Sequence, residues 1–264
     1  MKLTILGSGT CAVTLRRSCS CYYLRTEKLH IMLDMGFGAM RRMAEAGIDY
    51  RDIDLVVVSH FHLDHISDLP PLLMALRHTP GFARKKPLTI LGPPTLRSFL
   101  HGCRDLFGDW LLPADEYPLH IIEIDVEQVE IGDCLITAQP TLHTDHSNGY
   151  RLESGGASLM YSGDSGPCQA LIDLADKADL ALLECSFGND EPFEKHLTPQ
   201  QAARTAHLAG AKRLLLTHFY PQMDRNDVTG MCGTLFKGPI SIAEDLAHYE
   251  INHDDHATIS DGTF

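Results

Sequence analysis

The sequence contains no run of about 18 apolar residues, the length that a membrane-spanning helix requires. Its first ten residues, MKLTILGSGT, are typical of a strand and a glycine turn rather than of a secretory signal peptide. We therefore expect a cytoplasmic protein with no membrane partner. Positive charge is also scarce, because 35 acidic residues face 22 basic ones and the formal net charge is −13. The electrostatic field of a negatively charged protein repels nucleic acid and anionic membranes, so a polyanionic substrate needs local positive charge at its binding site.

The eight cysteines include no CxxC pair. This pattern favours reduced thiols in a cytosolic protein over a disulfide framework. Cys19 and Cys21 could hold a structural metal, but they lie beside a predicted strand from Tyr22 to Arg25. We therefore expect both side chains to be buried free thiols.

No linker, low-complexity segment or repeat divides the 264 residues, of which 44% are hydrophobic. A chain of this size can bury a sizeable core. We expect a single domain over residues 1–264, built of two merged βα halves. From Leu119 onward, the period-two patterns LHIIEIDV and VEIGDCLITAQP predict a meander of antiparallel strands, and thus a second sheet.

Shorter patterns predict individual elements in the first half. CYYLRT and HIMLD predict a hairpin, and residues 39–46 predict a helix closed by Gly47. Asp68 is expected to cap the helix that begins LPPLLMALRH, since proline is tolerated in a first turn. The apolar residues of this helix near Leu72 to Leu76 are expected to be exposed, which favours a homodimer.

The stretch DLVVVSHFHLDHISDLPPLL holds most of the chemistry in the chain. Its apolar run from Leu55 to Val58 predicts a strand buried on both faces. Four side chains that can bind metal follow at once, namely His60, His62, Asp64 and His65. The first two alternate on one side of an extended turn and can reach one cation, while the other two point towards a second. Imidazole and carboxylate ligands suit zinc, with iron and manganese as competitors.

Further candidate groups follow the ends of later predicted strands. In chain order they are His143 and His146, Asp164, Glu184, and His218. In layered α/β proteins the loops at the carboxyl ends of strands converge on one crevice, so we expect these groups to meet there.

Two ions can be assembled from these groups. One would be held by His60, His62 and His143, and the other by Asp64, His65 and His218. Asp164 would bridge them, and a shared carboxylate holds two ions roughly 3.5–4 Å apart, as in two-metal hydrolytic sites.

The order of the motifs resembles that in metallo-β-lactamase-fold hydrolases, in particular the ribonuclease Z-like and phosphodiesterase branch. The motifs that carry the resemblance are HFHLDH, GPPTLRSFL, HTDHSNGYRL, YSGDS, ECSF, HLTPQQAA and LLLTHF. The similarity runs from LGSGT to IAEDL, nearly the whole chain. It implies an α/β fold, a four-layered αββα sandwich with a dinuclear zinc cleft at one sheet edge. The implied cofactor is two Zn²⁺ per chain, which Mn²⁺ or iron could replace, and a homodimer is consistent with the family.

The resemblance also distinguishes between two histidines. His143 stands six residues before Gly149, as the family's ligand does, so it is favoured over His146. His146 could still line the pocket.

His196 has a different implied role, because it is not needed as a ligand. It precedes Thr198, which is predicted to cap a helix with Gln201 in a capping box, so its loop should be firmly held. By resemblance, His196 assists the departing oxygen and stabilises the transition state. Glu184 could orient His196 or a metal-binding histidine, and a simple strand-end salt bridge is the alternative.

The implied mechanism starts from a hydroxide held between two zinc ions, since such a water loses its proton near neutral pH. Asp64 would both bind metal and orient this nucleophile. His196 would protonate the leaving group, a step that typically contributes roughly 10²–10⁴-fold.

Departures from ribonuclease Z bear on the substrate. That family usually carries a long tRNA-binding arm between its third histidine and its bridging aspartate. Here His143 and Asp164 are only 21 positions apart (164 − 143), which leaves no room for an arm. Asp68 also replaces a frequent glycine, and YPQMD replaces the usual pattern after His218. These features favour a phosphodiesterase that acts on cyclic or short phosphodiesters.

Other functions remain open. One is a ribonuclease Z-type tRNA 3′ endonuclease, for which a basic stretch could contact RNA, namely Arg77-His78 and Arg84-Lys85-Lys86. A solvated loop is the commoner meaning of such a run. Another is a zinc hydrolase of thioesters or lactones. A non-catalytic metal-binding or RNA-binding module is the alternative outside enzymes. His253 and His256 in the tail are expected to have adventitious or structural roles.

Overall fold

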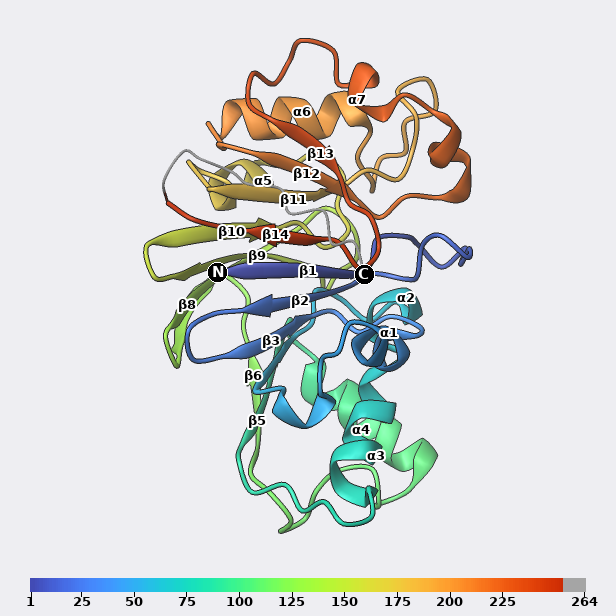
Figure 1. Cartoon of the computed structure of the whole chain (residues 1–264), viewed down its shortest axis with the longest axis vertical. Helices are drawn as coiled ribbons and strands as arrows, with labels where there is room; N and C mark the ends of the chain where they lie inside the picture. Colours follow the sequence, from blue (N-terminus) through green and yellow to red (C-terminus); the bar gives the residue numbers. More distant parts are fainter. Residues whose placement is uncertain (254–264) are drawn as a thin grey trace.

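The computed structural model describes residues 1–253, which form two seven-stranded sheets packed face to face (Figure 1). In spatial order the first sheet consists of β14 (His248–Glu250), β1 (Lys2–Gly7), β2 (Cys21–Arg25), β3 (His30–Leu33), β4 (Leu55–Val57), β5 (Leu88–Gly92) and β6 (Leu119–Glu123). The strands β14 to β3 pair antiparallel, and β3 to β6 pair parallel. The pairing of β2 with β3 confirms the predicted hairpin.

The second sheet has the same mixed character. Its order is β13 (Ile240–Ile242), β12 (Leu214–Thr217), β11 (Leu180–Glu184), β10 (Ala157–Tyr161), β9 (Asn148–Ser154), β8 (Cys134–Pro140) and β7 (Glu127–Ile131). The strands β10 to β13 are parallel and β7 to β10 antiparallel. Parallel strands at the centre are buried on both faces, which explains why β4 and β11 are almost uninterrupted apolar runs.

Helices cover the outer faces of both sheets. The first sheet carries α1 (Ala39–Glu45), α2 (Leu63–Ile66), α3 (Leu69–His78) and α4 (Leu96–Phe107), and the second carries α5 (Gln169–Leu174), α6 (Pro199–Leu208) and α7 (Val228–Met231). Two short 3₁₀ helices are η1 (Tyr50–Asp52) and η2 (Pro221–Arg225). In Figure 1, α6 and α7 lie at one end of the view and α3 and α4 at the other, with the strands between them. This is the expected four-layered αββα sandwich.

Three apolar cores hold the layers together. One lies between the sheets, where Tyr22 and Tyr161 meet edge to face with ring centroids 5.2 Å apart. The other two lie between each sheet and its helices. Each fully buried leucine or isoleucine stabilises the fold by about 1.5–3 kcal/mol relative to exposure.

Several local predictions were wrong. Residues 119–123 form β6, which pairs in parallel with β5 of the first sheet rather than in an antiparallel meander. The crossover through α4 is long enough to bring the chain back in the same direction, and a period-two pattern does not report which partner a strand meets. The side chain of Asp68 makes no cap bond to α3, because it accepts a hydrogen bond from the backbone N–H of Met40 instead.

The prediction that the apolar residues of α3 are exposed was also wrong. Leu72, Leu73 and Leu76 are buried against the first sheet. Within this stretch Met74 is the exposed large side chain, with 49% of its surface accessible. Cys19 and Cys21 are buried free thiols, as expected. Within residues 1–253, none of the helices combines the length and apolar character needed to cross a bilayer.

Candidate metal centre

The candidate ligands of the two halves meet at one edge of the sandwich. His60 follows β4, and α2 carries Asp64 and His65 in its single turn. His143, Asp164 and His218 follow β8, β10 and β12, as the argument from strand ends predicted. Seven candidate ligands gather there, namely His60, His62, Asp64, His65, His143, Asp164 and His218. His62 is exposed, and the other six side chains are buried, where water is largely excluded.

One group consists of three histidines and a carboxylate. Donor atoms of His60, His62, His143 and Asp164 all lie within 4.8 Å of one another. The Nε2 atom of His143 is 3.1 Å from Nδ1 of His62. The Oδ2 atom of Asp164 is 3.9 Å from Nε2 of His60 and 3.8 Å from Nε2 of His143.

A second group lies beside the first. Donor atoms of Asp64, His65 and His218 also lie within 4.8 Å of one another. The Nε2 atoms of His65 and His218 are 3.2 Å apart. The Oδ1 atom of Asp164 is 3.2 Å from Nε2 of His65 and 3.4 Å from Nε2 of His218. The two oxygens of Asp164 therefore face different groups of histidines.

The hydrogen bonds around the site fit bound cations. His60 Nε2 and Asp164 Oδ1 are buried and have no hydrogen-bond partner. Leaving such atoms unpaired costs about 1–3 kcal/mol each, which a bound cation would offset. His143 donates from Nδ1 to the Lys195 carbonyl, so its Nε2 carries a lone pair. This Nε2 atom lies 3.1 Å from Nδ1 of His62. Neutral imidazoles together with a carboxylate form a ligand set for a divalent metal.

Asp34 orients this site, and the sequence analysis missed it. Its Oδ2 accepts hydrogen bonds from His65 Nδ1 at 2.7 Å, from the Ser59 hydroxyl at 2.6 Å and from the Tyr161 hydroxyl at 2.5 Å. It stands directly after β3 in the left-handed region, with φ 57°, which aspartate tolerates better than most residues. An outer carboxylate of this kind fixes the tautomer of a metal-binding histidine. The strand-end argument applied to HIMLD could have found it.

Burial and neighbouring charges set the protonation states. Burial lowers the pKa of His60 well below its usual value, and the nearby His65 lowers it further, so its imidazole stays neutral. Burial alone would raise the pKa of Asp164, but His218 and His65 outweigh it and hold that pKa well below its usual range. A neutral imidazole beside an ionised carboxylate is the state that binds a cation.

His196 lies next to the two groups and is held by Glu184. Its Nδ1 is 2.7 Å from Glu184 Oε1, and one of its ring nitrogens lies within 4.8 Å of Asp164 and His218 donors. Burial lowers the pKa of His196, but the hydrogen bond and charge of Glu184 outweigh burial and raise it. Glu184 also accepts a hydrogen bond from the Ser186 hydroxyl at 2.7 Å. The carboxylate therefore contacts His196 rather than forming a surface salt bridge.

His146 lies outside these groups. Its side chain is exposed, and none of the candidate metal-binding groups found among residues 1–253 includes it. The geometry thus favours His143, as the motif spacing did.

Two residues of the basic run in the first half make contacts within the chain. Arg84 is buried and donates to backbone carbonyls, among them those of Ile53 and Pro87. Lys86 forms an ion pair of 2.8 Å with Asp54. The burial of Arg84 removes one cation of this run from the surface.

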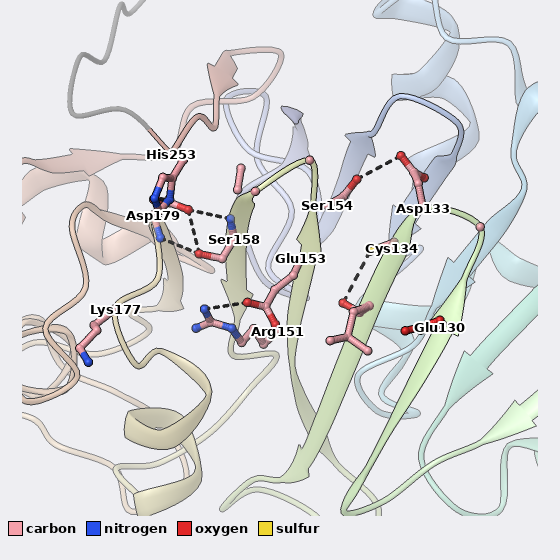
Figure 2. A pocket seen from close by; sticks show the side chains of 15 residues that line it. Glu130, Asp133, Cys134, Arg151, Glu153, Ser154, Ser158, Lys177, Asp179 and His253 are labelled. Carbon is pink, nitrogen blue, oxygen red and sulfur yellow. Dashed lines mark hydrogen bonds and ion pairs between the residues drawn. The ribbon is translucent and has the colours of Figure 1, made fainter.

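A separate cavity of about 600 Å³ lies at the opposite end of the second sheet, where β8 and β10 begin and β9 ends (Figure 2). Two of its carboxylates have the following partners within the chain. Asp133 accepts a hydrogen bond from Ser154, and Asp179 lies 3.8 Å from His253 Nδ1. His253 is thus remote from the candidate ligands, and His256 lies outside the described residues.

The fold and the histidine and aspartate cluster at its edge define a hydrolase of the metallo-β-lactamase fold. The chain belongs to the beta-lactamase superfamily, whose "Beta-lactamase superfamily domain" matches residues 30–219. The uncharacterized protein ML1173 of Mycobacterium leprae is 32% identical over 247 residues, which cover 91% of this chain and 85% of that protein. Ribonuclease Z of Myxococcus xanthus is 27% identical, with 93% of this chain and 96% of that enzyme covered.

A solved structure agrees with this assignment. The metallo-β-lactamase fold protein YhfI of Bacillus subtilis matches with a TM-score of 0.80 and 24% identity, covering 94% of this chain and 99% of that chain. These comparisons confirm both the predicted fold and the resemblance to the ribonuclease Z-like hydrolases.

Proposed function

We propose that the protein is a dinuclear zinc phosphodiesterase that acts on cyclic or short phosphodiesters. The observation that carries this proposal is the position of Asp164, whose two oxygens face two separate groups of histidines. His60, His62 and His143 would hold one ion, and Asp64, His65 and His218 the other. Zinc suits this ligand set best, and manganese or iron could replace it.

The residues around the two groups fit hydrolysis. Zinc ions bound there would lower the pKa of a water and neutralise charge on the phosphate. Asp64 would orient the hydroxide that remains once this water has lost a proton to solvent, and the hydroxide oxygen would form the new bond to phosphorus. His196 gives its proton to the leaving oxygen as the old P–O bond breaks. Glu184, at 2.7 Å from Nδ1, would hold the imidazole of His196 in place and leave its other nitrogen for the proton transfer.

The short connection between His143 and Asp164 supports a small substrate. The strands β9 and β10 fill most of it, joined by the tight turn Gly155-Gly156, whose φ angles are 58° and 78°. No long arm can extend from such a hairpin. Arg84 and Lys86 both make internal contacts, which leaves less of the basic run free for a large RNA.

A ribonuclease Z-type tRNA 3′ endonuclease is the second candidate, because Myxococcus xanthus ribonuclease Z is a full-length relative. A zinc hydrolase of thioesters or lactones could use the same ions, but it would have no need of His196 beside the leaving group.

The test combines metal content by mass spectrometry with rates on four substrates: bis(p-nitrophenyl) phosphate, a cyclic nucleotide, a precursor tRNA and a thioester. We expect two zinc ions per chain and turnover of the first two substrates. His196→Ala should keep its metal and lose roughly 10²–10⁴-fold in rate. His146→Ala, the matched control at an exposed histidine, should retain both metal and rate. Efficient cleavage of the tRNA without turnover of the small diesters would overturn the proposal, as would thioester hydrolysis alone.

A further inference from the structure

Three aromatic side chains form a continuous wall beside His196. We call Phe187, Phe193 and Tyr220 the aromatic wall. The ring centroid of Phe187 is 5.6 Å from that of Phe193 and 5.4 Å from that of Tyr220. The His196 ring lies 5.5 Å from Phe187 and 5.8 Å from Phe193. These spacings are those of interacting rings, so the wall and His196 form one aromatic cluster.

The wall comes from the same strand ends as the candidate metal centre. Phe187 follows β11 closely, and Tyr220 stands two positions after His218. Phe193 belongs to the loop that carries His196. The backbone N–H of His196 donates a hydrogen bond to the Phe193 carbonyl at 3.1 Å. This origin fixes the wall on the His196 side of the site.

The wall keeps much of its surface open. Phe193 is 51% exposed, while Phe187 and Tyr220 are partly buried. A single exposed phenylalanine needs no explanation. Here, however, the exposed ring continues an aromatic cluster that ends on the residue assigned to the leaving group, so a group that departs next to His196 would meet this ring.

We propose that the aromatic wall stacks against the base of a nucleoside leaving group, and that Phe193 determines a preference for nucleotides over aliphatic phosphodiesters. This inference rests on the proposed function, because His196 protonates the departing oxygen and so places the departing alcohol next to the wall. Stacking also suits a chain of net charge −13, since it binds a nucleotide without using positive charge. When an aromatic side chain that stacks on a base is removed, the affinity of the protein for that ligand typically falls by about five-fold to more than 100-fold.

The test compares two five-membered cyclic diesters, a nucleoside 2′,3′-cyclic phosphate and glycerol 1,2-cyclic phosphate. They present similar P–O bonds and differ in the base and sugar. Phe193→Leu keeps apolar bulk and removes the ring, and it should lower kcat/KM for the nucleoside substrate about ten-fold, mainly through KM. The glycerol substrate should be affected by less than about two-fold. Phe193→Trp should retain the nucleoside rate.

A matched control is Leu208→Ala, which removes an exposed apolar side chain on α6 and should change neither rate. Equal losses on both substrates in Phe193→Leu would overturn the inference, because they would mean that Phe193 only packs His196 in place. Unchanged rates in Phe193→Leu would overturn it as well. If wild-type protein hydrolyses the glycerol substrate with no preference for the nucleoside, the proposed function survives and the inference fails. If wild type hydrolyses bis(p-nitrophenyl) phosphate but neither cyclic diester, the inference alone fails, and if it hydrolyses none of the three, both fail.

Discussion

Asp164 shows how a single side chain can organise two sets of partners. Its Oδ1 lies 3.2 Å from His65 Nε2, while its Oδ2 lies 3.8 Å from His143 Nε2. Because the carboxylate is buried and ionised, it needs positive charge nearby on both sides. A pair of divalent cations bound between the carboxylate and the histidines would supply that charge on both sides.

We expect Asp164→Ala to lose metal and activity together. Without the carboxylate both groups of histidines lose the ligand that they share. The metal content per chain should fall, and the rate on bis(p-nitrophenyl) phosphate should drop by more than about 100-fold. Loss of a residue that only orients a metal ligand lowers activity by up to about 100-fold, and loss of a shared ligand should lower it further. Mass spectrometry and initial rates measure the two effects, and circular dichroism checks the fold.

The control for this change is Asp145→Ala, an exposed aspartate between His143 and His146. It should leave metal content and rate unchanged. An Asp164→Ala protein that kept two ions and full activity would contradict the bridging role.

At the scale of elements, α6 fixes the loop that carries His196 and Phe193. The Thr198 hydroxyl accepts a hydrogen bond from the backbone N–H of Gln201, and the Gln201 side chain accepts one from the backbone N–H of Thr198. This capping box was predicted from the sequence and is confirmed. Its reciprocal bonds satisfy two N–H groups that the first turn of a helix would otherwise leave unpaired.

Thr198→Ala should therefore destabilise the protein. Loss of a helix cap typically costs about 0.5–2 kcal/mol of unfolding free energy, and the buried position of Thr198 favours the upper half of that range. The midpoint of urea unfolding measures the change. Thr198→Ser keeps the oxygen and should restore most of the stability. Gln200→Ala, at an exposed neighbouring position, should change it by less than about 0.5 kcal/mol. If Thr198→Ser were as unstable as Thr198→Ala, the cap oxygen would not be the cause.

At the scale of the whole molecule, the candidate metal centre joins the two halves of the sandwich. His60 and His65 come from the first half, and His143, Asp164 and His218 extend from strands of the second sheet. Cations bound by both sets would link the sheets at this edge, in addition to the apolar core between them.

Removal of metal should thus lower the thermal stability of the whole protein. A cation present at 100 times its dissociation constant stabilises the folded state by about 2.7 kcal/mol. For a chain of this size that corresponds to a fall in Tm of roughly 5–10 °C on chelation. Scanning calorimetry before and after chelation measures it, and added zinc should restore the original value. Asp164→Ala should show little difference between the two conditions. An unchanged Tm in wild-type protein proven free of metal would count against a site that links the halves.

Much of the candidate site could be predicted from the sequence, because its residues follow strands that are themselves evident. Asp164 and His218 each stand within three residues of the end of a short apolar run, and strand ends converge by the geometry of the fold. Asp34 also follows such a run, but its role depends on a hydrogen bond to His65, 31 positions away in the chain. Local patterns contain no information about contacts at that separation.

The sequence by itself determined the elements, the family and the identity of the candidate ligands, because these depend on periodicity, caps and motif order within short stretches. Only the tertiary structure decided that β6 joins the first sheet, that Arg84 is buried, and that the oxygens of Asp164 face different histidines. It also brought Phe187, Phe193 and Tyr220 together as the aromatic wall. These features are distances between residues far apart in the chain, and packing of the two sheets and their loops sets them.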